Sequence, residues 1–258
     1  QMREDMGKHH AEVQNKMLVM PLEHYGENSA MPHIERNYTS LLKVVSSRAE
    51  LLAIDGGVLA TDTTSASNNL GKIFGQERFS AASFLDATVD FGSGYAAGDV
   101  RSLTLTRLND TIRNLRTAGG APKVILTGYD TIQAIADLLQ SQERFMDRKE
   151  VVPTVNGVRG VKGAEVGFRV STYYDIPLIP VKDMPSTTGA STSISDLLFL
   201  DTDHMWLSVM KPTQYFEDGI ANGNPFGVGT LGNRALYRTI GEVGCSFFKG
   251  QGKITNLQ

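Results

Sequence analysis

Cysteine is almost missing from this sequence of 258 residues, and long apolar runs are missing altogether. The single cysteine, Cys245, excludes a disulfide within the chain and a metal site built from several thiolates. We interpret it as a small buried apolar residue. No apolar run reaches the roughly 18 residues that a membrane-spanning helix needs, and no signal peptide is recognisable. We therefore expect no interaction with a membrane.

An excess of charge of either sign is also lacking. The chain has 25 Lys and Arg against 28 Asp and Glu, which gives a formal net charge of −3. That balance excludes the basic footprint of a protein that grips nucleic acid tightly, although a protein can lie beside nucleic acid without gripping it. Hydrophobic residues make up 41% of the chain. This is enough for the core of one large domain or two small ones.

Signatures of nucleotide binding and acyl transfer are weak or missing. Gly227, Gly229 and Gly232 match the dinucleotide-binding spacing GxGxxG. That motif needs a strand before it and a helix after it. Here Pro225 comes just before it, and the stretch that follows is rich in β-branched residues, aromatic residues and glycine. We interpret the glycines as a turn between two strands. No GxSxG elbow or coherent catalytic triad is recognisable.

Residues that could ligate a metal ion are scattered. His9 and His10 are adjacent on a predicted helix and therefore point to different faces. The turn from Asp201 to His204 could bind a metal, but Asp-rich turns occur for backbone reasons alone. Three histidines have no cysteine or carboxylate partner at ligand spacing: His24, His33 and His204. We therefore predict no catalytic, cofactor-binding or metal-binding residues, no cofactor and no enzyme activity.

The start of the chain has the pattern of one face of a helix. Pro21 ends this pattern, because proline cannot continue a helix. Residue 1 is Gln and no capping residue precedes the pattern, so we expect the helix to begin upstream, in a processed or longer chain. The apolar residues at near-helical spacing are Met2, Met6, Val13, Met17 and Met20.

A helix–strand–helix unit is predicted over residues 104–139. Thr104 or Thr106 caps the first helix, and Gly119 occupies its C-terminal cap. Residues 123–127 form a short strand, and Asp130 or Thr131 caps the second helix. Such a unit is a packing module, so we predict that the tight turn at Gly128 positions the chain and holds no ligand. The apolar faces consist of Leu105, Leu108, Ile112 and Leu115 in the first helix and Ile132, Ile135 and Leu139 in the second.

The remaining segments are predicted mostly as strands and loops. Pro177 and Pro180 place the apolar stretch 176–180 at a sheet edge or in a loop. Residues 41–54 predict a short helix or strand, and residues 55–98 an ordered but irregular region, because aromatics are interspersed with Gly, Ser and Thr. Residues 186–195 predict a polar loop. Strands are predicted over 151–155, 164–172, 197–200, 205–210 and 234–248, the last as a long strand or hairpin.

Two segments carry a family resemblance. Residues 108–139 (LNDTIRNLRTAGGAPKVILTGYDTIQAIADLL) and 196–217 (DLLFLDTDHMWLSVMKPTQYFE), followed by 229–257, resemble in that order the major capsid proteins of tailed bacterial and archaeal viruses. Lys211-Pro212 fills a basic-Pro step that precedes the last strands in that family. The first predicted helix resembles the C-terminal part of the family's long spine helix. The likeness covers more than half of the chain.

The resemblance implies an α+β fold of the Hong Kong 97-like capsid type. Residues 1–100 would form a peripheral domain with the spine helix and an irregular elaboration, residues 101–210 an axial domain, and residues 211–258 the return strands of the peripheral domain. The family's N-terminal arm and extended loop have no counterpart here, and residues 55–98 do not follow the family pattern. The lysine–asparagine pair that cross-links some relatives has no match either. The loop 186–195 would lie near a capsomer axis or at a surface.

The resemblance also implies a function based on self-assembly. Hexamers and pentamers of the chain would close into an icosahedral shell around packaged double-stranded DNA, in a virion assembled in the host cytoplasm. Decoration or cement proteins, scaffold and portal are the further partners it implies. Three alternatives stay open: an encapsulin-type compartment that houses protein, an enzyme using residues 227–232 or 201–204, and a tail or decoration protein.

Overall fold

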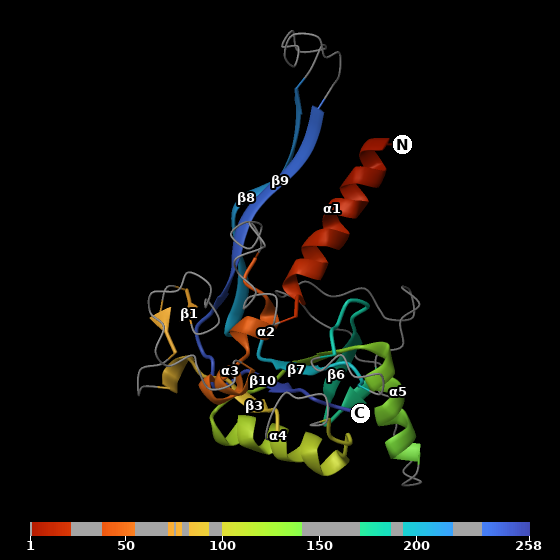
Figure 1. The fold of residues 1–258 in the computed structure, drawn as a ribbon, viewed down its shortest axis with the longest axis vertical. Coiled ribbons are helices and arrows are strands. Elements are labelled where there is room, and N and C mark those ends of the chain that lie inside the picture. The colour runs from red at the N-terminus through yellow and green to blue at the C-terminus, as the bar shows by residue number, and fades with distance from the viewer. Residues whose placement is uncertain are drawn as a thin grey trace.

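The computed structural model describes residues 2–21, 38–54, 72–74, 76–78, 83–92, 100–140, 171–186, 193–218 and 234–258, and the statements below concern these residues. They form a mixed α+β structure, which confirms the expected fold class. A body of sheet and helices carries a long two-stranded ribbon, and helix α1 (Met2–Leu18) runs beside that ribbon (Figure 1). As the sequence predicts, α1 ends before Pro21.

The body is built on a six-stranded sheet with the strand order β3-β10-β7-β4-β6-β5. Strand β4 runs parallel to β6 and antiparallel to β7, while β10 runs antiparallel to β7 and parallel to β3. The six strands are β3 (Thr88–Asp90), β4 (Val124–Thr127), β5 (Ser171–Tyr173), β6 (Ile176–Pro180), β7 (Leu197–Leu200) and β10 (Gly252–Ile254).

Apolar side chains cover both faces of the sheet, and strand β7 contacts both of these layers. All four of its residues are buried. Leu197 and Phe199 belong to a core cluster with α4 and α5, whereas Leu198 and Leu200 belong to a second cluster with α2 and α3. Because side chains alternate along a strand, an uninterrupted apolar run such as LLFL requires apolar partners above and below. The helices are α2 (Leu41–Val44), α3 (Arg48–Ile54), α4 (Leu105–Thr117) and α5 (Tyr129–Gln140).

The helix–strand–helix unit has the predicted form. Thr104 caps α4 by accepting a hydrogen bond from the backbone N–H of Arg107, and Gly119 ends the helix with φ of +90°. Helix α5, however, begins at Tyr129, ahead of the predicted caps Asp130 and Thr131. Both side chains form hydrogen bonds with the backbone of Ser195, which lies in a distant segment. The prediction that Asp130 or Thr131 caps the helix is therefore wrong.

The prolines of β6 misled the prediction for residues 176–180. This segment is an internal strand, with β4 on one side and β5 on the other. Pro177 and Pro180 are the second and the last of its five residues. Proline is tolerated there because strand ends need fewer ladder hydrogen bonds than strand centres do.

The ribbon pairs β8 (Met205–Asp218) with β9 (Arg234–Cys245) in an antiparallel register. Strand β8 extends beyond the predicted 205–210 and contains Pro212. Register shifts between Val209 and Lys211 and between Lys211 and Gln214 flank this proline. Such irregularities accommodate a residue that cannot donate to the ladder.

The less regular regions of the chain contain short helices and short strands. Residues 41–54 contain the two short helices α2 and α3, so the helical alternative is confirmed. The described part of 55–98 holds short elements: β1 (Lys72–Ile73), β2 (Gln76–Glu77), the 3-10 turn η4 (Ser83–Leu85) and β3. The predicted strand 151–155, most of 164–172 and most of the loop 186–195 lie outside the described residues. Among the described helices, none is long and apolar enough to cross a membrane.

The sheet draws on all three expected domain segments. Strand β3 comes from residues 1–100, β4 to β7 come from 101–210, and β10 comes from 211–258. The described structure is therefore grouped most simply as a body around this sheet and a projection made of the ribbon and α1 (Figure 1).

Candidate functional site

Helix α1 and the ribbon touch through polar and aromatic groups. The imidazole of His10 stacks on the ring of Tyr237 with centroids 5.8 Å apart and an interplanar angle of 27°. Gln14 Nε2 donates to Thr239 Oγ1 at 2.7 Å. His10, Gln14 and Arg3 lie within one face of the helix, because residues three, four and seven apart share a side. The face of α1 that meets the ribbon is therefore largely polar.

Arg3 strengthens this contact near the N-terminal end of the helix. Its guanidinium lies 4.6 Å from the centroid of the Tyr215 ring and forms an ion pair with Glu217. The backbone carbonyl of Arg3 accepts a hydrogen bond of 3.1 Å from the hydroxyl of Tyr237. Arg3 is largely exposed, so the ion pair itself adds little stability, and the helix is held by the whole set of contacts.

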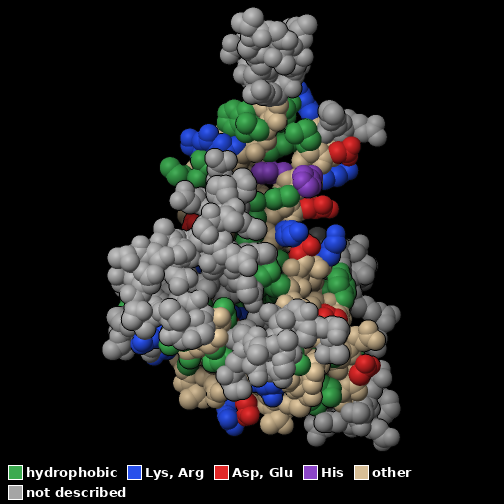
Figure 2. All heavy atoms as spheres, viewed as in Figure 1, with side chains coloured by type: hydrophobic (Ala, Val, Ile, Leu, Met, Phe, Trp, Pro, Cys, Tyr) green, Lys and Arg blue, Asp and Glu red, His purple; other side chains and the backbone are tan. Residues whose placement is uncertain are grey.

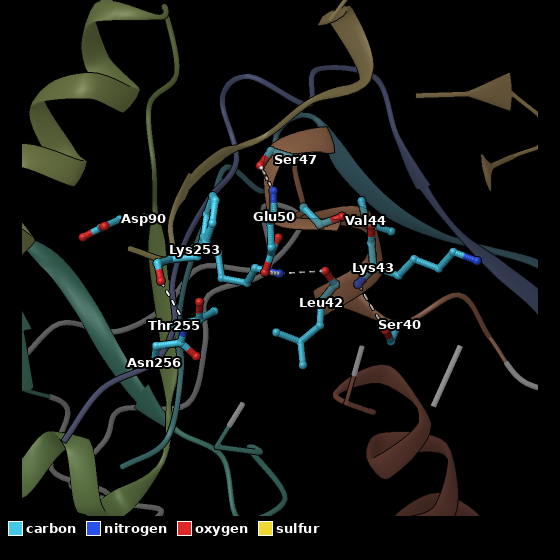
Figure 3. Close-up of polar contacts among 12 residues, drawn as sticks. Ser40, Leu42, Lys43, Val44, Ser47, Glu50, Asp90, Lys253, Thr255 and Asn256 are labelled. Carbon is cyan, nitrogen blue, oxygen red and sulfur yellow. Dashed lines mark hydrogen bonds and ion pairs between the residues drawn. The ribbon is translucent and has the colours of Figure 1, made fainter. Parts of the chain in front are cut away.

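Within the body, a cluster of buried charges joins β10 to α2 and α3 (Figure 3). Lys253 Nζ lies 2.6 Å from Glu50 Oε1, and both side chains are almost completely buried. Lys253 also donates to the backbone carbonyl of Leu42 at 3.2 Å. In Figure 3 the ammonium group points from β10 towards α2 and α3, where Glu50 and Leu42 lie. A buried pair of this kind fixes the position of one element against another.

Arg78 is the second buried cation of this cluster. Its guanidinium donates to the backbone carbonyls of Lys43 and Val44, each at 2.9 Å, and to the hydroxyl of Ser46. Burial lowers the pKa of Arg78 to about 10, which leaves it charged at neutral pH. Burial, with the nearby charge of Arg78, lowers the pKa of Lys43 to about 8. The carbonyl groups at the end of α2 have no intrahelical partners, and Arg78 donates hydrogen bonds to them.

Side chains of the protein occupy the space beside Gly128. A Cβ at this position would lie 2.6 Å from the Cβ of Ser195. Ser195 also donates its backbone N–H to Asp130 Oδ2 at 2.8 Å and accepts the hydroxyl of Thr131 at 2.6 Å. Glycine is required for steric reasons, and the hydrogen-bonding groups of the turn are used within the chain. This agrees with a turn that positions α5.

The two segments that resemble the family lie in the body and in the ribbon: residues 108–139 form most of α4, all of β4 and most of α5, and residues 196–217 form β7 and most of β8. The family model of the SU10 major capsid protein matches residues 45–223, more than half of the chain. The chain belongs to this family. The matched region runs from the end of α2 through β8 and includes both segments, 108–139 and 196–217. The expected resemblance to major capsid proteins is thereby confirmed, and the role of the protein is structural.

Comparison with solved structures gives a remote likeness. The holo-SrpI encapsulin complex from Synechococcus elongatus matches with a TM-score of 0.42 and 10% sequence identity, over 66% of this chain. The match spans about half, 53%, of that encapsulin chain. No curated protein matches the sequence.

The residues that were weighed as metal ligands from the sequence, Asp201 and His204, make structural hydrogen bonds in this capsid-family protein. Asp201 accepts the backbone N–H of Asp203 at 3.2 Å and that of Ala121 at 3.2 Å. His204 shares a hydrogen bond of 3.1 Å with Ser246. No group of three His, Cys, Asp or Glu side chains that could hold a metal ion occurs among the described residues. Gly227 to Gly232, with His24 and His33, lie outside them, but the strands on either side of the glycines pair with each other.

Sequence reasoning missed the buried charges. Nothing in the sequence distinguishes Lys253, Glu50 or Arg78 from surface residues, because their partners are distant in the chain. By contrast, Cys245 is buried as predicted, and burial raises the pKa of its thiol to about 11. The exposed apolar residues of the ribbon were missed as well. Strand alternation could have indicated them, had the length of β8 been known.

Proposed function

We propose that the protein is the structural subunit of an icosahedral viral capsid with the Hong Kong 97-like fold. Subunits assemble into hexamers and pentamers, and these close into a shell around packaged double-stranded DNA. The observation that carries the proposal is the family match over residues 45–223. A subunit that meets several neighbours can rely on contacts that are individually modest, because closed symmetry makes them reinforce one another.

The shape of the subunit supports the same proposal. Helix α1 along the ribbon corresponds to the spine helix and the peripheral domain, and the sheet body with α4, β4 and α5 corresponds to the axial domain (Figure 1). In this assignment β3 and β10 go with the axial body, because they pair within its sheet. Residues 205–218 and 234–245 go with the peripheral projection.

The charge distribution fits a container for DNA. The net charge of −3 gives no basic wall that would hold the packaged DNA and resist its release. Lys, Arg, Asp and Glu side chains are interspersed on the visible face (Figure 2). The subunit therefore encloses DNA without sequence-specific binding. In the virion, decoration or cement proteins, scaffold and portal are its further partners, and no catalytic step is assigned to it.

The test measures assembly and cargo together. The full chain is expressed, purified, treated with nuclease and examined by sedimentation velocity and by nucleic-acid extraction. Large particles are expected, with protected double-stranded DNA when they are isolated from virus-infected cells. Particles that contain protein cargo and no DNA would favour an encapsulin-type compartment. A protein that stays monomeric under all conditions would contradict a shell function.

A further inference from the structure

Strand β8 has one edge without a partner strand. The ribbon is two-stranded, so β9 pairs with one edge of β8, and no described strand lies along the other edge. A Cβ on Gly241 of β9 would lie 2.7 Å from the backbone oxygen of Ser208, so this carbonyl points into the ribbon. Backbone groups alternate in direction along a strand. The N–H and C=O groups of Leu207 and Val209 therefore point to the free edge.

An uncharged, apolar stretch forms this part of β8. Residues 205–210 read MWLSVM, and Lys211 and Pro212 follow them. Edge strands of soluble proteins commonly carry charges or proline that prevent pairing with another chain, and this stretch has neither before Lys211. Four of the eleven exposed large apolar side chains that the structure describes lie within it: Trp206 (50% exposed), Leu207 (48%), Val209 (50%) and Met210 (77%).

These apolar side chains lie on both faces of the ribbon. Leu207 shares one face with its cross-strand partner Val243, and Trp206 shares the other face with Gly244. Val243 is 3% exposed, so the chain covers β9 on that face and leaves Leu207 of β8 open. A helix docked on one face would contact only half of these side chains. A further strand along the free edge contacts both sets, because its own side chains alternate between the faces.

The largest side chain of the stretch leaves the free edge accessible. A Cβ on Gly244 would lie 2.5 Å from Nε1 of Trp206, so the indole lies over β9 rather than over the edge. The first register shift of the ribbon falls between Val209 and Lys211. The regular part of the edge therefore ends at Val209, and a partner strand has to be centred close to the middle of residues 205–210.

We propose that β8 pairs in antiparallel fashion with β8 of a second copy of this chain, about a two-fold axis at Ser208. The partner is a second copy because the family builds shells from its subunits, so this inference rests on the proposed function. The contact is isologous, since the same edge is used by both subunits, and it joins two ribbons into one four-stranded sheet.

The position of the axis follows from the side chains that it pairs. With Ser208 on the axis, Leu207 of each copy lies opposite Val209 of the other, and their outward backbone groups form hydrogen bonds. On the other face Trp206 lies opposite Met210. All four exposed apolar side chains thus gain cross-strand partners. An axis at Leu207 would instead place Trp206 opposite Ser208.

A cysteine at the axis tests this pairing. In Ser208→Cys the two copies of the residue form a non-hydrogen-bonded pair with Cα atoms roughly 4.5 Å apart, within the range of a disulfide. The native Cys245 is buried. Mild oxidation of the purified full chain should therefore give a disulfide-linked dimer on a non-reducing gel. Gln214→Cys is the matched control, exposed on the same strand. Its two copies would lie roughly 40 Å apart, so it should give at least about tenfold less dimer.

Charges beside the axis test the register. In the Ser208→Cys chain, Leu207→Lys with Val209→Lys places like charges opposite one another and should lower the dimer yield by at least about tenfold. Leu207→Lys with Val209→Glu places opposite charges there and should restore the yield. Both side chains are exposed, so the melting temperatures should stay close to that of Ser208→Cys.

The outcomes separate this inference from the shell function. Particles of Ser208→Cys that give no more disulfide-linked dimer than Gln214→Cys would overturn the strand pairing and leave the shell function standing. Equal dimer yields from the two charge variants would overturn the proposed register. Efficient dimer formation by Ser208→Cys in a protein that never forms particles would support the pairing and contradict the shell function.

Discussion

Lys253 in β10 and Glu50 in α3 form a buried ion pair between distant parts of the chain. Removing one partner leaves an uncompensated charge in the core. We expect Lys253→Met to lower the free energy of unfolding by about 3–5 kcal/mol, and Lys253→Met with Glu50→Gln to recover a large part of that loss. Urea denaturation of the unassembled subunit measures both. Lys123→Met, which breaks the exposed ion pair with Asp203, is the control and should cost less than about 1 kcal/mol. A single variant as stable as the wild type would refute the structural role of the pair.

Lys43 gives a prediction about pH. Burial lowers its folded-state pKa to about 8, below the unfolded value of 10.5. Between these two values the unfolded chain binds more protons than the folded one, so stability rises with pH. Compared with Lys43→Met, the wild type should gain about 1–3 kcal/mol of unfolding free energy between pH 8 and pH 10. Equal pH slopes for the two proteins in denaturant titrations would show that Lys43 titrates normally.

A sequence pattern reveals the structural role of some residues and not of others. Cys245 and Gly119 were predicted correctly because composition and helix-end chemistry restrict their roles locally. The partners of Lys253 and Arg78 are set by tertiary structure. A lysine in a short C-terminal strand has the same sequence signal whether it is solvated or buried.

At the scale of elements, the turn between β4 and α5 tests the packing argument. Gly128→Val would place side-chain atoms within the space of Ser195 and disrupt the contact between α5 and the segment before β7. We expect a loss of several kcal/mol in unfolding free energy, or failure to fold, as for other overpacked sites. Gly7→Ala is the control, since a Cβ there would lie 3.5 Å from the hydroxyl oxygen of Tyr237, an ordinary contact. A Gly128→Val protein that folds and assembles normally would contradict this account.

The contact between α1 and the ribbon gives a second test at this scale. Tyr237→Ala removes the stack on His10 and the hydrogen bond to the backbone of Arg3. Amide hydrogen exchange in α1 should become faster, while β7 in the doubly covered sheet keeps its protection. Tyr174→Ala, an exposed residue of the body, should leave both unchanged. Unaltered exchange in α1 would mean that other contacts hold the helix.

Elements with strong local signals were predicted well, and elements that depend on neighbours were not. The period of Leu108, Ile112 and Leu115, with Thr104 and Gly119 at the ends, defines α4 from its own residues alone. Strand β6 was misassigned because its prolines were weighed without its partners β4 and β5. Strand β8 was predicted too short, because the irregular pairing around Pro212 is not visible in the sequence.

At the scale of the whole molecule, the body is held by apolar clusters on both faces of one sheet, whereas the projection depends on polar contacts. The resemblance of two segments was enough to indicate the capsid family. It did not show that β3 and β10 lie in one sheet with β4, β5, β6 and β7, because sequence order does not determine sheet order. Which apolar side chains of the ribbon are exposed likewise follows from the register of β8 and β9, which the sequence does not specify.

The central claim is that this chain is a shell subunit, and electron microscopy of the purified full chain tests it most directly. The account predicts closed particles of uniform size, with hexameric and pentameric capsomers in class averages. Dispersed monomers, open tubes or sparse trimers under conditions in which the protein is folded would contradict it.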